Sequence, residues 1–330
     1  ITSPRQQLIN YSLFHNNSIV YRDRCFPVLY LEFLAMKDAT LTRKSDPDHR
    51  SVVALSDTVS VGGDTLLIVG GPCAVESAEQ MEQVAQSLSS TPVQALRGGV
   101  FKPRTSPYAF QGLGETGLRI LDDVRQRFAM PVISEVMAID QIELMADYVD
   151  VLQVGSRNMQ NFDLLKALGR TTQPVLLKRG LAATLEEFVM AAEYILSHGN
   201  PHVVLCERGI RSFDTYTRNV LDLGAVVALK QITHLPVLVD PSHAAGKREL
   251  VPALGRAAIA AGADGLIVEC HPVPDESVSD ARQALTLEEM AALARSLEPI
   301  ATALGRRLGP TDTAFGPELK EVSGAIALVA

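Results

Sequence analysis

Short apolar runs alternate regularly with amphipathic stretches over most of this chain. Eight of the runs are rich in Val, Ile and Leu, which is typical of strands that are buried on both faces. These runs are Leu66–Gly70, Val93–Arg97, Pro131–Ser134, Val149–Val154, Pro174–Lys178, His202–Cys206, Pro236–Asp240 and Gly265–Glu269. Between most of them, apolar positions recur at helical spacing. The clearest of these predicted helices are Ala78–Leu88, Gly117–Phe128, Leu185–Leu196 and Leu250–Ala261.

Eight strand-then-helix units in about 240 residues predict a closed parallel barrel. We therefore expect an α/β protein with a single (β/α)8 barrel, the TIM barrel, over residues 64–308. The alternative is an open, doubly wound sheet. The first strand of such a sheet is normally followed by G-x-G-x-x-G, and GGPCAVE lacks that spacing. Residues 1–63 are predicted to be a short irregular N-terminal extension, and residues 309–330 a C-terminal tail.

The first 35 residues differ from the rest of the chain in composition. They hold three of the seven Tyr and three of the ten Phe, and they show neither strand nor helix periodicity. The stretch MKDATLTRKSDPDHRSVV begins at Met36, is mostly polar and resembles the natural start of a protein chain. Our hypothesis is that residues 1–35 are an upstream extension or a remnant and not part of the native core.

Net charge, hydropathy and the cysteine pattern limit the classes of function that the chain can have. The 330 residues carry a net charge of −8, which argues against nucleic acid as a main partner. No apolar run is long enough to span a bilayer, and no clear signal peptide is present. The four cysteines show no C-x-x-C pairing, which is typical of reduced thiols. We therefore expect a cytoplasmic protein.

Polar side chains follow the carboxyl ends of nearly all the predicted strands. In a (β/α)8 barrel those ends meet at one face, where active sites are built. Several of these side chains are basic, which predicts an anion pocket large enough for more than one phosphate or carboxylate. The basic residues are Arg97, Lys102, Arg104, Arg157, Lys178, Arg179 and Arg208. Thr105 and Ser106 add two hydroxyl groups beside Arg104, in a long loop that is rich in Gly and Pro.

A second set of side chains in this region has metal-binding chemistry. Thiolate, imidazole and carboxylate groups from Cys73, His243, Glu269 and Asp280 together suit a borderline divalent ion such as Mn, Fe, Co or Zn. The first three follow strands that are neighbours when the barrel closes. The competing interpretation is a packed cysteine and a hydrogen-bonded loop histidine. Purely structural roles are expected for Cys206, Cys270, His198, His202 and His271.

Seven longer motifs stand in a fixed order along about residues 64–305, nearly the whole predicted barrel. They are GPCAVES, KPRTSPYAFQGLG, GSRNMQNF, LLKRG, LCERGIRSF, VDPSHAAGKRE and VECHPVPDESVSDARQ. In this order they resemble 3-deoxy-D-arabino-heptulosonate 7-phosphate (DAHP) synthase. The resemblance is greatest to the group of these enzymes that is related to 3-deoxy-D-manno-octulosonate 8-phosphate (KDO8P) synthase.

The resemblance implies a metal-dependent enzyme that condenses phosphoenolpyruvate with D-erythrose 4-phosphate to give DAHP and phosphate. This is the first step of the shikimate pathway of aromatic amino acid biosynthesis. It implies that a divalent metal is bound by Cys73, His243, Glu269 and Asp280. It further implies that phosphoenolpyruvate is bound by Arg97, Lys102, Arg157, Lys178 and Arg208, and erythrose 4-phosphate by Arg104, Thr105 and Ser106.

The implied catalytic residues are Lys178, His243 and Cys73. The metal would act as a Lewis acid on the aldose carbonyl. Lys178 is a candidate general acid, and His243 or a water molecule are the alternatives. The resemblance also implies a homo-oligomer, either a dimer or a tetramer.

Two other functions compete with this one. KDO8P synthase uses arabinose 5-phosphate, but KPRT favours the four-carbon sugar because that family has an Asn in the corresponding loop. A non-catalytic barrel that binds a phosphorylated sugar would be favoured by loss of a ligand or of KPRT, and none is lost.

The sequence departs from its relatives in three places. Ser156 stands where Ala is expected, no fused chorismate mutase fits in the tail, and fewer than 65 residues precede the barrel. We therefore expect neither a ferredoxin-like regulatory domain nor feedback control by an aromatic amino acid.

Overall fold

The eight predicted strands form one closed barrel in the computed structural model, which describes residues 38–104 and 106–309. Hydrogen-bonded neighbours follow the order β10-β3-β4-β5-β6-β7-β8-β9, and all neighbouring pairs are parallel. The strands are β3 (Leu67–Gly71), β4 (Ala95–Arg97), β5 (Val132–Val136), β6 (Val151–Val154), β7 (Val175–Lys178), β8 (Val203–Glu207), β9 (Val237–Val239) and β10 (Gly265–Glu269). The predicted (β/α)8 fold is confirmed. The segment 1–35, the residues after 309 and Thr105 lie outside the described residues.

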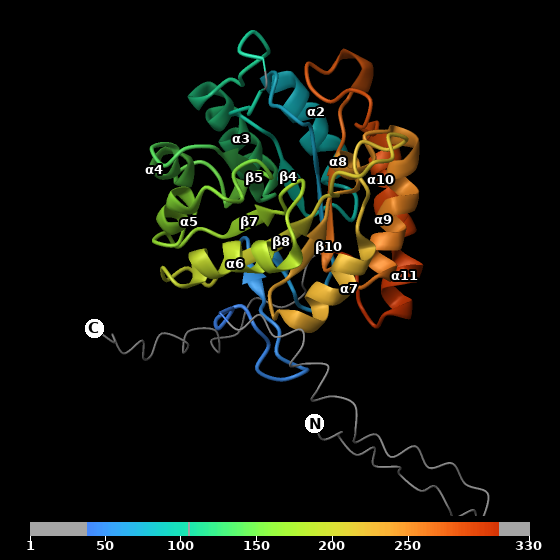
Figure 1. Ribbon diagram of the computed structural model, residues 1–330. Coiled ribbons are helices and arrows are strands. Elements are labelled where there is room, and N and C mark those ends of the chain that lie inside the picture. The colour runs from blue at the N-terminus through green and yellow to red at the C-terminus, as the bar shows by residue number, and fades with distance from the viewer. Residues whose placement is uncertain (1–37, 105, 310–330) are drawn as a thin grey trace, which may run out of the picture. The chain divides into compact units, whose positions relative to one another are not determined.

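Helices follow the strands and surround the barrel (Figure 1). They are α2 (Ala78–Leu88), α3 (Glu115–Phe128), α4 (Gln141–Ala146), α5 (Phe162–Leu168), α6 (Leu185–Leu196), α7 (Leu223–Ile232), α8 (Pro241–Ala245), α9 (Val251–Ala260), α10 (Leu287–Ser296) and α11 (Glu298–Ala303). Two 3-10 helices are η1 (Arg248–Leu250) and η2 (Pro274–Glu276). In the described part of the chain, no helix is long and apolar enough to cross a bilayer.

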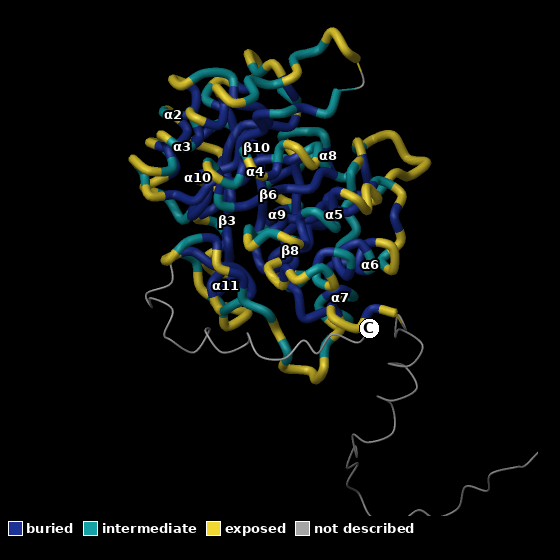
Figure 2. Tube along the Cα trace, turned by 90° about the vertical axis from the view of Figure 1, so that its left-hand side faces the viewer, coloured by how far each residue is buried: buried dark blue, intermediate teal, exposed yellow. Residues whose placement is uncertain are grey.

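Alternation along the strands divides the apolar residues into two clusters. In β3, for example, Leu67 and Val69 belong to the cluster inside the barrel, while Ile68 belongs to the larger cluster between the barrel and the helices. Successive strand side chains point to opposite faces, which explains this division. Both faces are covered, so every position of the barrel strands except the partly exposed Glu135 is buried, whereas exposed positions lie on the outer surface (Figure 2). This burial explains why the strands read as continuous apolar runs.

A hairpin of β1 (Val53–Ala54) and β2 (Ser60–Val61) covers the amino end of the barrel. Val53, Leu55, Val59 and Val61 belong to the same buried cluster as the side chains inside the barrel. No regular structure was predicted for this segment. Its apolar residues fill an opening and form no long periodic face, so they give no strand or helix signal in the sequence. The hairpin closes the end of the barrel opposite the polar strand ends.

The segment before the hairpin is bound to the barrel through one carboxylate. Glu193 on α6 accepts five hydrogen bonds, from the backbone N–H groups of Thr40, Leu41 and Thr42 and from both threonine hydroxyls, at 2.7–3.0 Å. Glu193 is 7% exposed. This carboxylate therefore binds the segment to α6 and satisfies both donors of the buried Thr42.

We predict that Glu193→Ala lowers the free energy of unfolding by about 3 kcal/mol, because the segment loses a charged acceptor that both buried donors of Thr42 use. Burial raises the pKa of Glu193, but the hydrogen bonds from Leu41 and Thr42 outweigh it and lower the pKa from its usual value of 4.5. The stabilisation is therefore complete above pH 4.5 and is lost as the pH falls through the folded-state pKa. Denaturant unfolding measures both effects, with Glu186→Ala, an exposed position on the same helix, as the control. A loss as small as that of the control would contradict this role.

Candidate functional site

A cavity of about 330 Å³ lies at the carboxyl ends of the barrel strands. Eight of its lining side chains are basic and only two are acidic, although the whole chain carries a net charge of −8. Such a concentration of like charge draws anions into a cleft. The lining residues are Arg97, Lys102, Pro103, Arg104, Glu135, Gln153, Gly155, Ser156, Arg157, Lys178, Leu181, Arg208, Arg211, Arg218, Asn219, His243 and Asp280.

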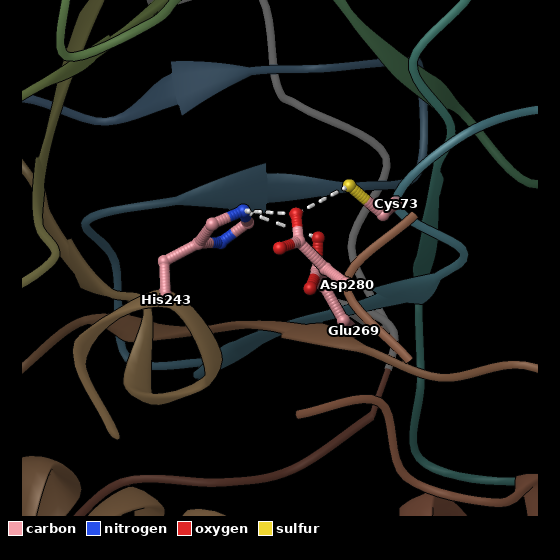
Figure 3. A group of neighbouring side chains, drawn as sticks. All are labelled: Cys73, His243, Glu269 and Asp280. Carbon is pink, nitrogen blue, oxygen red and sulfur yellow. Dashed lines mark hydrogen bonds and ion pairs between the residues drawn. The ribbon is translucent and has the colours of Figure 1, made fainter. Parts of the chain in front are cut away.

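The four predicted metal ligands come together at one side of this cavity. The ligand atoms of Cys73, His243, Glu269 and Asp280 all lie within 4.8 Å of one another. The Cys73 Sγ is 3.2 Å from Asp280 Oδ2, and His243 Nε2 is 3.2 Å from Glu269 Oε1. Figure 3 shows the imidazole and the thiol on opposite sides of the two carboxylates. Two carboxylates, one imidazole and one thiol that converge in this way fit a borderline divalent cation.

The orientation of His243 is fixed by Asp240, the residue that follows β9. The Oδ2 atom of Asp240 lies 2.6 Å from His243 Nδ1 and also pairs with the ammonium group of Lys178. Because Asp240 engages Nδ1, the Nε2 atom of His243 faces the other three ligands. A carboxylate on the far ring nitrogen is the usual support of a metal-binding histidine. Burial raises the pKa of Asp240, but the charges of His243 and Lys178 outweigh it and hold the pKa well below its usual range.

Glu269 is positioned by two neighbours at the end of β10. Arg97 at the end of β4 donates to its Oε1 atom at 2.6 Å, and Gln283 donates to its Oε2 atom at 2.5 Å. Burial raises the pKa of Glu269, but His243 and Arg97 outweigh that effect and lower the pKa. The carboxylate is therefore held ionised and in a fixed orientation.

Cys73 lies at the bottom of the site, 3% exposed, just after β3. Its Sγ atom accepts from Lys102 at 3.0 Å and from the Ser279 hydroxyl at 3.2 Å. Burial, reinforced by the charge of Glu269, raises the pKa of the thiol to about 12. A divalent cation supplies the positive charge that turns such a thiol into a thiolate ligand. The donor set therefore fits a metal ion in charge as well as in geometry.

The basic residues of the cavity divide into two groups by their partners. Arg97, Lys102 and Lys178 are at most 8% exposed and bind to Glu269, Cys73 and Asp240. Arg218 also pairs with a carboxylate, that of Asp280. The others carry cationic groups that no carboxylate of the described chain neutralises. This second group comprises Arg104, Arg157, Arg208 and Arg211. The Nη2 atom of Arg104 is buried and has no hydrogen-bond partner within the described chain.

Glu135 is the one carboxylate of the lining outside the metal group. It lies at the end of β5, and its Oε2 atom accepts from Gln153 at 3.3 Å. A Cβ atom at position 155 would stand 2.0 Å from Glu135 Oε1, so only glycine lets this side chain occupy its place. Gly155 therefore explains how a carboxylate is accommodated among the arginines.

The cavity contains the predicted binders of phosphoenolpyruvate: Arg97, Lys102, Arg157, Lys178 and Arg208. Arg104 also lines it, whereas Ser106 is exposed in its loop and is not part of the lining. The prediction that Arg179 belongs to the anion pocket was wrong. Its guanidinium points away from the cavity and pairs with Glu207 and Asp222.

Besides Glu135, five residues of the site received no role in the sequence analysis: Ser279, Gln283, Asp240, Arg211 and Arg218. Arg218 donates to both Asp280 and Gln283. Two signals were available: Asp240 stands at the end of a predicted strand, and Arg211, Ser279 and Gln283 lie in the motifs LCERGIRSF and VECHPVPDESVSDARQ. Neither signal reveals which loop side chains turn toward the cavity.

Comparison with known proteins shows which family the chain belongs to. Residues 44–305 match the sequence model of the DAHP synthetase I family. The chain is 47% identical over 265 residues to the phospho-2-dehydro-3-deoxyheptonate aldolase of Thermotoga maritima, covering 80% of this chain and 78% of that one. It is 33% identical over 254 residues to the 2-dehydro-3-deoxyphosphooctonate aldolase of Syntrophotalea carbinolica, covering 72% and 91%.

Solved structures lead to the same family. The crystal structure of the Thermotoga maritima DAHP synthase superposes with a TM-score of 0.79 at 44% identity, covering 83% of this chain and 79% of that one. A truncated form of the enzyme from Thermotoga maritima gives a TM-score of 0.75 at 43% identity, with 81% and 98% covered. With the family match extending over most of the chain, this protein belongs to the DAHP synthetase I family.

Proposed function

We propose that this chain condenses phosphoenolpyruvate with D-erythrose 4-phosphate and water to give DAHP and phosphate, the entry reaction of the shikimate pathway. The observation that carries the proposal is the metal-binding group of four residues beside a cavity with eight basic side chains. Two phosphorylated substrates need such an excess of positive charge. Family membership supports the choice of reaction.

Cys73, His243, Glu269 and Asp280 are proposed to hold one divalent ion, either Mn, Fe, Co or Zn. When bound, the ion polarises the aldose carbonyl as a Lewis acid. Asp240 and Arg97 hold the imidazole and the Glu269 carboxylate in their orientations.

Phosphoenolpyruvate is proposed to lie against the basic residues at the end of the barrel. Arg97, Lys102 and Lys178 are buried in the cavity and are positioned by their own partners. Arg157 and Arg208 have guanidinium groups available for an incoming phosphate or carboxylate. Fixed donors of this kind supply positioning, which lowers the barrier by limiting the freedom of the reactants.

Erythrose 4-phosphate is proposed to bind beside the loop of Arg104, Thr105 and Ser106. The buried, unpartnered Nη2 atom of Arg104 supports a phosphate contact, because a buried donor without a partner is costly unless a ligand satisfies it. This arrangement directs the aldehyde end of the sugar toward His243 and Asp280 and the phosphate end toward the loop.

Proton transfers follow from the groups around the two substrates. The enol carbon of phosphoenolpyruvate bonds to the aldehyde carbon, and water adds at C2 before the C–O bond to phosphate breaks. Lys178 is proposed to donate the proton that the new alkoxide needs, since its ammonium group lines the cavity and Asp240 holds it in place. Glu135 is proposed to orient the water, because no basic side chain of the described residues neutralises its carboxylate.

The proposed function is tested by phosphate release with two aldoses, erythrose 4-phosphate and arabinose 5-phosphate, in the presence of phosphoenolpyruvate and Mn²⁺. We expect kcat/KM for the four-carbon sugar to exceed that for the five-carbon sugar by at least about tenfold. The opposite preference would make the chain a KDO8P synthase. No phosphate release with either sugar would leave a binding barrel without this activity.

Arg211 is expected to contribute to substrate binding although it was not recognised from the sequence. Its side chain lines the cavity, is exposed and has no ion-pair partner in the described chain. We predict that Arg211→Ala raises KM for one of the two substrates about tenfold, by about 1.4 kcal/mol, with a smaller change in kcat. The control is Arg295→Ala, an exposed arginine on α10. Steady-state kinetics with KM values equal to those of the control would exclude this role.

A cytoplasmic homo-oligomer is also proposed. Dimers and tetramers are what the family resemblance implies, and free Cys73, Cys206 and Cys270 are compatible with a reducing compartment. Sedimentation velocity at micromolar concentration measures the number of subunits.

A further inference from the structure

Glu76 is a partly buried carboxylate whose role the proposed mechanism leaves open. It lies in the loop between β3 and α2, three residues after Cys73, and its side chain is 18% exposed. Neither lysine nor arginine pairs with it in the described part of the chain. Its backbone N–H donates to Gln80 at 2.9 Å, and the Gln80 amide donates to Ala74 at 3.3 Å. The backbone of this loop is therefore held by its own hydrogen bonds through Gln80. The Glu76 carboxylate takes no part in them and binds another segment of the chain.

The partners of the Glu76 carboxylate lie more than 190 residues later, in the loop between β10 and α10 (Gly265–Glu269 and Leu287–Ser296). Its Oε1 atom accepts from the Val278 N–H and lies within hydrogen-bonding distance of the Ser277 hydroxyl, both at 3.1 Å. The Nε2 atom of His271 lies 3.5 Å from the same oxygen. The other nitrogen of His271 accepts from Val273 at 3.0 Å, which leaves Nε2 protonated and facing Glu76.

This loop carries Asp280, the fourth residue of the metal-binding group. The Ser277 hydroxyl also lies 2.8 Å from the carbonyl oxygen of Ser279, and the Ser279 hydroxyl donates to Cys73 Sγ at 3.2 Å. Two residues after Val278, Asp280 places its Oδ2 atom 3.2 Å from the same sulfur. The Glu76 carboxylate is therefore connected to Asp280 through its hydrogen bonds to Ser277 and Val278 and the short backbone segment that follows them.

The backbone at Asp280 needs such support. Its φ angle is 57°, in the left-handed region that non-glycine residues adopt at a cost. Apolar packing around it is limited, since Val273 and Val278 are about half exposed, at 47% and 52%. A loop with little buried apolar surface and a strained residue keeps its conformation only when polar contacts fix it. The carboxylate of Glu76 supplies two such contacts, to the Val278 N–H and the Ser277 hydroxyl.

We propose that Glu76 is a positioning residue for the metal site, which holds the loop of Asp280 against the loop of Cys73. The inference rests on the proposed metal site and adds a residue outside the ligand group. Without the carboxylate, the Val278 N–H loses its acceptor, and Asp280 no longer stays within reach of Cys73. The other three ligands keep their own supports, Lys102 for Cys73, Asp240 for His243 and Arg97 for Glu269.

The test measures the Kd for Co²⁺ by competition with a chelating indicator, using the full chain. Glu76→Ala is expected to weaken Co²⁺ binding about 10–100-fold, the usual effect of removing an outer partner of a metal ligand. Glu76→Gln keeps an acceptor oxygen, and the Oε2 position has no partner that a –NH2 group would disturb in the described chain. We expect it to bind Co²⁺ within about threefold of the wild type. Glu79→Ala, an exposed carboxylate on α2, is the matched control and is expected to have no effect.

Two further readouts separate positioning from general loss of structure. At saturating Co²⁺, the absorption band of a cobalt-bound thiolate should persist in Glu76→Ala, because Cys73 stays in place. In an Asp280→Ala background, Glu76→Ala should cause no further loss of affinity, because its effect is transmitted through Asp280.

Wild-type affinity in Glu76→Ala, or an effect that persists undiminished without Asp280, would overturn the inference and leave the proposed function standing. Failure of the wild type to bind Co²⁺ would overturn the metal site itself.

Discussion

Replacing Cys73 by serine is expected to remove metal-dependent turnover while the barrel remains folded. The sulfur is one of four ligand atoms that lie within 4.8 Å of one another, and a serine hydroxyl cannot replace a thiolate for a borderline cation. Loss of outer partners already costs about 10–100-fold, so a direct ligand is expected to cost more than about 100-fold in kcat at a fixed metal concentration. His243→Ala should have the same result, because it removes the only nitrogen ligand of the group.

Phosphate release with saturating substrates measures this effect, and thermal unfolding followed by circular dichroism reports on the fold. Cys270→Ser is the matched control, since Cys270 is a fully buried thiol that does not belong to the ligand group. It is expected to retain activity even if its stability falls. Wild-type kcat in Cys73→Ser would exclude a catalytic role for the metal group.

The second large effect is expected from Asp240→Asn. Asp240 is 1% exposed and neutralises Lys178 while it orients His243, so an amide leaves a buried ammonium group without its counter-charge. Breaking a buried ion pair on one side typically costs about 3–5 kcal/mol of stability. The imidazole also loses the carboxylate that fixes its tautomer, a change that costs about 10⁴-fold in the serine protease triad. We expect kcat to fall by at least about 100-fold.

Asp222→Asn is the control for this substitution, because Asp222 also forms an ion pair, with Arg179, but outside the cavity. Comparing the two variants distinguishes an effect on kcat from an effect on stability. A loss of stability without a loss of kcat in Asp240→Asn would assign Asp240 a structural role and would contradict the proposed support of Lys178 and His243.

The elements of the barrel could be predicted because each is specified locally. The predicted helices Ala78–Leu88 and Leu185–Leu196 agree with the observed bounds of α2 and α6. Ser77 caps the first, and a capping box of Thr184 and Glu187 begins the second, so the sequence itself marks where these helices start. The strands are buried on both faces, and their continuous apolar runs are equally local signals.

Side-chain direction explains the error at Arg179. Lys178 and Arg179 are adjacent at the end of β7, so they point to opposite faces. Lys178 lines the cavity, whereas Arg179 turns outward to Glu207 and Asp222. Strand periodicity alone implied that only one of the two could enter the pocket.

The supporting residues of the site could not be predicted because their roles depend on partners far along the chain. Glu76 binds the loop that contains Ser277 and Val278, and Gln283 binds Glu269 only because that loop returns toward the strand end. The hairpin of β1 and β2 could not be predicted for the same reason. Its apolar residues fill an opening that exists only after the barrel closes.

Titration of metal-stripped protein with Mn²⁺ tests the central claim most directly. After treatment with a chelator, the chain is assayed for phosphate release from phosphoenolpyruvate and erythrose 4-phosphate as the ion is added back. The account predicts no turnover without the metal and a rise that saturates at one ion per chain, the number held by the single ligand group of the described residues. Full turnover by the metal-stripped protein would contradict it.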